Sequence, residues 1–69
     1  MNWEIVKGNW TQWKGKVKEA WGDLTDDDLD KISGERDQLV GRLQERYGWL
    51  KEDAEREIDA WYERHSRAA

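Results

Sequence analysis

Lysines and tryptophans alternate over the first third of the chain. Lysines can neutralise phosphates, and an indole ring can stack on a nucleobase, so this mixture is typical of proteins that bind single-stranded nucleic acid. One candidate function is therefore a nucleic-acid-binding or protein-binding module that uses this first helical segment. The residues concerned are Lys7, Trp10, Trp13, Lys14, Lys16, Lys18 and Trp21.

The spacing of the tryptophans argues against a stacking surface. Trp10, Trp13 and Trp21 recur at steps that place them on one helical face, whereas Lys16 and Lys18 fall elsewhere. We expect the three rings to turn inward and form core. An alternative is that the same face lies in a membrane interface, which would require the helix to leave the rest of the fold.

A run of aspartates follows, and it could bind a divalent cation. A calcium loop of the EF-hand type needs alternating oxygen ligands, a central glycine and a glutamate at its twelfth position, and the run lacks that pattern. Thr25 is a good helix N-cap, and the acids after it suit the positive end of a helix dipole. We therefore expect capping and no metal site. The acids are Asp23, Asp26, Asp27, Asp28 and Asp30.

An enzymatic function has little support in the sequence. The carboxylate pairs Asp26/Asp28 and Asp53/Glu57 would need a pocket that shifts their pKa values, and we expect them in first turns or on solvated faces. His65 is the single histidine and is expected in solvent near the end of the chain. We expect no catalytic residue, no cofactor site and no metal ligand.

The composition indicates one small soluble domain over residues 1–69. Apolar residues make up 36% of the chain and charged residues 41%, with a mean hydropathy of −1.22, so six Trp and two Tyr must supply much of the core. The absence of Cys fits a reducing compartment. Without an apolar run of transmembrane length or a signal-peptide pattern, we expect a cytoplasmic location.

Apolar periodicity and capping residues predict an all-α fold of four helices. The first is expected from about residue 4 to 21, capped by Asn2 or by Asn9 with Gln12, and closed by a left-handed Gly22. Residues 1–7 are expected to be disordered or to extend this helix. The second helix is expected over about 26–33 and the third over about 35–47, ended by Gly34 and Gly48 respectively. The fourth starts at Lys51, and residues 66–69 should fray. The inward positions after the first helix are Leu24, Leu29, Ile32, Leu39, Val40, Leu43, Tyr47, Leu50, Ala54, Ile58, Trp61 and Tyr62.

Residues 8–33 resemble residues 34–59. A shift of 26 residues aligns three glycines with three glycines, and eight of the 26 positions are identical. Each unit reads as a helix, a glycine-containing turn and an acid-capped second helix. We therefore expect a four-helix bundle made of two αα-hairpins that pack on each other.

Gly15 and Gly41 lie inside predicted helices, where glycine costs about 1 kcal/mol relative to Ala. Both fall roughly opposite the apolar stripe of their helix, so we expect them on the outer surface. Their faces either reflect tolerated weakening of the helix or allow close approach of another helix or a second copy of the chain.

The pattern GNW..WKGKVKE.WG.LTDDD, followed by GERDQL.GRLQERYG, resembles the CsbD-like family of small bacterial stress proteins, in particular its YjbJ-type members. The resemblance runs from about Gly8 to Trp61. It implies a small cytoplasmic helical protein associated with general stress, without assigned catalytic residues or ligand. We therefore expect a non-enzymatic, hydrophilic protein that acts through weak surface interactions or protects macromolecules.

Overall fold

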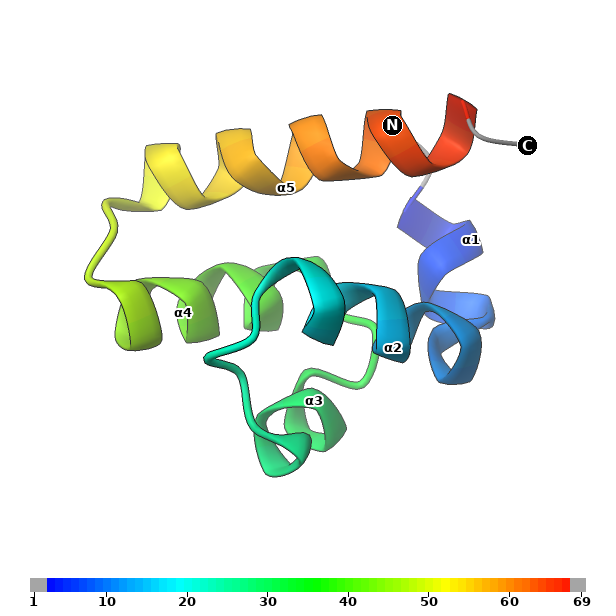
Figure 1. Cartoon of the computed structure of the whole chain (residues 1–69), viewed down its shortest axis with the longest axis horizontal. Coiled ribbons are helices and arrows are strands. Elements are labelled where there is room, and N and C mark those ends of the chain that lie inside the picture. Colours follow the sequence, from blue (N-terminus) through cyan, green and yellow to red (C-terminus); the bar gives the residue numbers. More distant parts are fainter. Residues whose placement is uncertain (1–2, 68–69) are drawn as a thin grey trace.

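A computed structural model describes residues 3–67, and every regular element in that range is a helix. The prediction of an all-helical fold is confirmed. The predicted count of four is wrong for the described residues, because the first predicted helix is divided in two. The helices are α1 (Trp3–Gly8), α2 (Trp10–Ala20), α3 (Asp26–Ile32), α4 (Arg36–Tyr47) and α5 (Lys51–Arg67) (Figure 1).

Asn9 causes the division between α1 and α2. Its backbone, at φ −122° and ψ 36°, leaves the helical region. Its side-chain Nδ2 donates to the carbonyl oxygen of Ile5 at 3.0 Å, so it turns back to α1 and makes no capping bond to α2. The predicted capping box of Asn9 with Gln12 is therefore wrong. The alternative cap, Asn2, lies outside the described residues. The break lets α1 point away from the axis of α2 (Figure 1).

The N-terminal cap of α3 forms at Thr25, as the sequence predicted. The Asp28 backbone N–H donates to the Thr25 hydroxyl at 3.1 Å, and the Thr25 backbone N–H donates to the Asp28 carboxylate at 3.0 Å. This reciprocal pair satisfies two donors at the helix start. At the other end Ser33 and Gly34 both have positive φ, 49° and 82°. Gly34 is required, since an added Cβ would lie 3.0 Å from the Lys7 Cα.

The turns that close α2 and α4 differ. Gly48 ends α4 with φ 72°, as predicted. The prediction that Gly22 is left-handed is wrong, because Gly34 and Gly48 are the described glycines with positive φ. The first turn spans residues 21–25 and the second spans 48–50, so α3 and α5 start 25 residues apart although α2 and α4 start 26 apart. The starts of the second helices therefore do not reproduce the predicted 8–33/34–59 repeat.

The helices form a small packed unit with principal extents of 31 × 23 × 18 Å. Helix α5 runs along one side, with α4 and α2 below it and α3 on the far side (Figure 1). Helix α1 lies by the C-terminal end of α5. Helix α5 extends through Arg67, beyond the residue at which fraying was expected. Residues 68–69 lie outside the described range.

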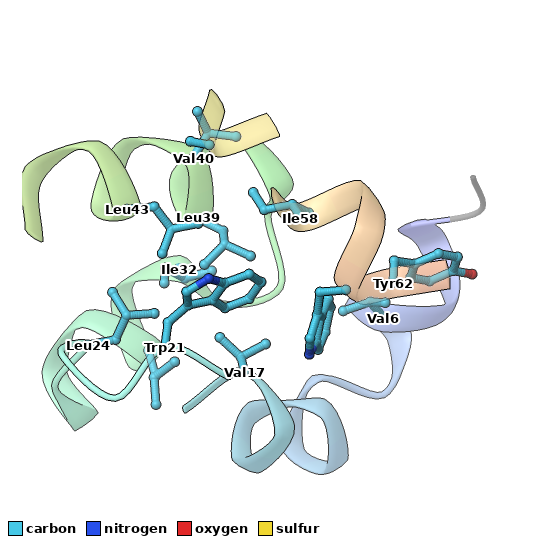
Figure 2. Packing of buried hydrophobic residues seen from close by; sticks show 13 residues of the cluster. Val6, Val17, Trp21, Leu24, Ile32, Leu39, Val40, Leu43, Ile58 and Tyr62 are labelled. Atoms are coloured by element: carbon cyan, nitrogen blue, oxygen red, sulfur yellow. The ribbon is translucent and has the colours of Figure 1, made fainter. Parts of the chain in front are cut away.

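The buried side chains come from all five helices and from the turn between α2 and α3 (Figure 2). Trp21 is 5% exposed, whereas Trp10 and Trp13 are half-buried against the core, so their predicted inward orientation holds only in part. Leu50 was predicted inside and is 72% exposed. Leu50 lies in the turn before α5, so its side chain does not follow the apolar face of that helix. The buried apolar residues are Val6, Val17, Trp21, Leu24, Leu29, Ile32, Leu39, Val40, Leu43, Ala54, Ile58, Trp61 and Tyr62.

Candidate interaction surface

Three of the four lysines in the first third of the chain are paired with acids. Lys7 Nζ lies 2.6 Å from a Glu35 carboxylate oxygen, and Lys18 Nζ lies 2.7 Å from Asp26. Lys14 donates to Asp30. These pairs tie α1 and α2 to α3 and to the residue after its C-terminal turn. The basic face that the sequence suggested is therefore largely neutralised by the acidic run that follows it.

Lys16 has a different environment. Its ammonium nitrogen lies 4.8 Å from the centre of the Trp13 ring, a distance at which a cation is attracted to the face of an indole. Trp13 in turn stacks on Tyr62 with an angle of 21° and meets Trp61 edge-on, at centroid distances of 6.0 and 5.5 Å. The ring therefore links α2 to α5, and Lys16 covers part of it.

The indole nitrogens of two other tryptophans are used inside the molecule. Trp3 Nε1 donates to the carbonyl oxygen of Gly34 at 2.6 Å, and Trp10 Nε1 donates to that of Leu29 at 3.2 Å. Both acceptors lie in the last turn of α3 or just after it. Trp10, one of the rings predicted as a possible stacking surface, thus joins Trp3 in holding the C-terminal end of α3 against α2 and α1.

Four aspartates of the acidic run each pair with a cation. Asp26 and Asp30 meet lysines of α2, and Asp27 lies 3.2 Å from Lys31 one turn later in α3. Asp28 meets α4. Because their oxygens point to different partners, the run does not form a cluster of ligands. Among the described residues, no three His, Cys, Asp or Glu side chains are grouped so as to hold a metal ion.

Among the residues whose burial the structure describes, Asp28 is the one charged residue in the core, at 2% exposed. Arg46 donates to both of its oxygens, from Nε at 2.8 Å and from Nη2 at 3.1 Å. Arg42 adds a third nitrogen at 3.8 Å. The Arg46 guanidinium, and then the Thr25 backbone N–H, hold the pKa of Asp28 far below its usual range. An ionised, fully bonded carboxylate of this kind is a structural centre and a poor proton donor or acceptor.

The other carboxylate pair singled out in the sequence, Asp53 and Glu57, lies on α5, where Asp53 is half-buried. Asp53 lies 3.6 Å from Arg56, and Glu57 is exposed on α5. His65 departs from expectation: it is half-buried, with its ring centre 5.0 Å from that of Trp61 and 6.3 Å from that of Trp13. It completes an aromatic cluster where a solvated histidine had been expected.

Two arginines that hold helices together carry no signal in the sequence that marks them as functional. Arg46 binds Asp28 of α3, and Arg36 pairs across to α5, with Glu55 at 3.4 Å and Asp59 at 2.9 Å. The partners are separated by 18 to 23 residues, so no helical spacing connects them. The only hint in the sequence was an aspartate at the third position of α3, which forms part of a capping box.

Gly15 and Gly41 are exposed as predicted. A Cβ added at either position would meet no atom within 4 Å outside its own helix. Their faces are therefore open surfaces of α2 and α4. None of the helices in the described part of the chain is long and apolar enough to cross a lipid bilayer.

Comparison with known proteins places the chain among small bacterial proteins. The CsbD-like family model matches residues 4–56. The UPF0337 protein YjbJ of Escherichia coli O6:H1 is 62% identical over 65 residues, 94% of each chain. YjbJ of Escherichia coli K12 is 58% identical over the same share of both chains. A UPF0337 protein of Pseudomonas aeruginosa is 60% identical over 58 residues, 84% of this chain and 89% of its own. The chain therefore belongs to the CsbD-like family and is of the YjbJ type.

Proposed function

We propose that this protein is a non-enzymatic, cytoplasmic stress-response protein that protects macromolecules through weak contacts of a hydrated, charged surface. The observation that carries the proposal is how the charges are used. Charged residues form 41% of the chain, and those of opposite sign pair across the helices, so the surface is strongly hydrated without a field of one sign. Among the described residues, Ile5 and Leu50 are the large apolar side chains left exposed.

A protection assay tests this proposal. A labile dehydrogenase is dried or freeze–thawed with equimolar wild-type protein, and its residual activity is compared with that left by an inert globular protein of similar mass. We expect clearly higher recovery with the wild type. Recovery no higher than with the inert protein would remove the basis of the proposal.

A charge-depleted variant is the matched control. Glu19, Asp37 and Glu57 are exposed and have no ion-pair partner among the described residues. Replacing them by Gln, Asn and Gln removes hydrated carboxylates and leaves the helix-to-helix pairs in place. We expect an unchanged helical spectrum and weaker protection. Full protection by this variant would indicate that the exposed carboxylates are not what matters.

The alternative, a nucleic-acid-binding or protein-binding module on α1 and α2, has less support. Three of its lysines are bound to acids, and its indoles donate to or pack against the protein's own core. A mobility-shift titration with single- and double-stranded DNA at two salt concentrations separates the two functions. Salt-sensitive binding with a Kd below about 1 µM would favour the alternative.

Weak contacts with other proteins or with a second copy could use the open faces around Gly15 and Gly41. The absence of any neighbouring atom at these positions is consistent with close approach of another backbone. The alanine variants described in the Discussion test whether these faces do more than weaken their helices.

A further inference from the structure

Leu50 is the most exposed large apolar side chain in the described part of the protein, at 72%. It lies in the turn between α4 and α5. Consider residues 36–67 as one continuous helix with 100° per residue. Leu50 would then share an arc of about 80° with the buried or half-buried apolar residues on either side of the turn. These residues are Leu43, Tyr47, Ala54, Ile58 and Trp61. The apolar stripe of α4 thus continues in register through the turn into α5.

Little in the turn prevents such a continuous helix. It comprises only residues 48–50, and the chain contains no proline. Gly48 still donates its N–H to the Gln44 carbonyl, at 2.9 Å, as in a helix, and then departs with φ 72°. Rotation of the backbone at Gly48 and the two residues after it would join α4 to α5.

We propose that α4 and α5 can straighten into one helix across residues 48–50, and that the straightened form pairs with a second copy of the chain by exchanging α5. The occupant of the surface that α5 vacates is then α5 of the second copy. That helix carries every group the surface already binds. These include Glu55 and Asp59 for Arg36, and Ile58 and Trp61 for the core. The exchange reuses existing contacts, which makes it a low-cost route to a dimer.

The exchanged form also gives Leu50 a place. In the hairpin its side chain faces solvent, whereas in the straightened helix it lies on the apolar stripe at the crossing point of two equivalent helices. There it would meet the partner's Leu50. The hairpin is favoured in turn by the stack of Tyr47 on Trp49, with centroids 4.6 Å apart and planes 17° apart, which straightening would break. Dimer formation should therefore depend on protein concentration.

Gly48→Ala is the direct test. A Cβ at residue 48 meets no atom within 4 Å, so the variant is penalised only through the left-handed backbone. Alanine also favours a continuous helix over glycine, and the two effects together should shift the balance toward the straightened form by about tenfold or more. Gly41→Ala is the matched control, since that glycine is equally uncrowded but lies inside α4 without a positive φ. We expect a dimer for Gly48→Ala and a monomer for Gly41→Ala in sedimentation velocity.

Leu50→Lys provides an independent second arm. Leu50 is exposed in the hairpin, so the change should leave monomer stability nearly unaltered. In the straightened helix it places a charge on the apolar stripe. We expect Gly48→Ala/Leu50→Lys to return to monomer. Wild type refolded at high concentration should yield some dimer, and the Leu50→Lys variant should yield none.

Exchange of α5 has a kinetic signature that contact between surfaces lacks. Tagged and untagged dimers should trade subunits slowly in native buffer and quickly in mild denaturant, because trading requires opening. The proposal is overturned if the Gly48→Ala variant folds and stays monomeric. It is also overturned if Gly41→Ala forms as much dimer as Gly48→Ala, or if Leu50→Lys does not reduce the amount of dimer. If Gly48→Ala does not fold, a wild type that refolds at high concentration without dimer overturns it.

Discussion

Arg46 of α4 binds the buried carboxylate of Asp28 in α3 with two nitrogens, at 2.8 and 3.1 Å. The same carboxylate accepts the Thr25 backbone N–H at the start of α3. One side chain thus caps a helix and fastens it to its neighbour. Since α3 has only seven residues, its position depends strongly on this contact.

Replacing Asp28 by Asn should therefore destabilise the protein although the shape is kept. The amide cannot accept both nitrogens of Arg46 as a carboxylate does, and the charge attraction is lost. We expect a loss of about 1–3 kcal/mol in the free energy of unfolding, measured by urea denaturation. Asp27→Asn, at the neighbouring exposed position, is the control and should cost no more than about 0.5 kcal/mol. Equal effects of the two changes would contradict a special role for Asp28.

The stability should also fall in acid because of Asp28. Its pKa is lowered in the folded state, chiefly by Arg46, so the unfolded chain takes up this proton at a higher pH. The contribution is fully present above the pKa of the unfolded carboxyl, near 4, and is lost as pH falls toward the folded value. We expect the difference in Tm between wild type and Asp28→Asn to be largest at neutral pH and to shrink below about pH 4. A difference independent of pH would show that the carboxylate charge is not its source.

Alanine at Gly15 or Gly41 should stabilise the protein. Both positions are exposed inside helices and leave room for a Cβ, so only helix propensity changes. We expect a gain of about 0.5–1 kcal/mol for each variant in thermal or urea unfolding, and additive gains in the double variant. Sedimentation of the same proteins tests the glycine faces. If wild type and variants are all monomers, self-association through these faces is excluded.

The two indole hydrogen bonds at the C-terminal end of α3, from Trp3 and Trp10, should contribute unequally to the stability of the protein. Leu29 keeps a bond from the Ser33 N–H when Trp10 is replaced by Phe, since both donors share its oxygen. Trp3→Phe removes the shorter bond, to Gly34. We expect both variants to lose stability within about 0.5–1.5 kcal/mol, with the larger loss for Trp3→Phe. Trp49→Phe is the control, because that indole makes no hydrogen bond among the described residues. An equal loss in the control would assign the effect to ring size.

Local pattern alone predicted the all-helical class, the Thr25 cap, the end of α4 at Gly48 and most of the buried positions. These features depend on residues three or four apart in sequence, which are neighbours in any helix. The family resemblance, confirmed by comparison, depended likewise on spacing within the chain. The exposure of Gly15 and Gly41 followed from the same geometry.

Only the tertiary structure decided the break at Asn9, the exposure of Leu50, the partial burial of His65 and the partners of the charged residues. Asn9 is part of a break that lets Trp3 reach Gly34, 31 residues later. The Asp28–Arg46 pair joins two helices whose relative placement no periodicity specifies. Such features depend on how the helices lie against one another. A helical repeat determines which face of each helix is apolar and leaves that placement open.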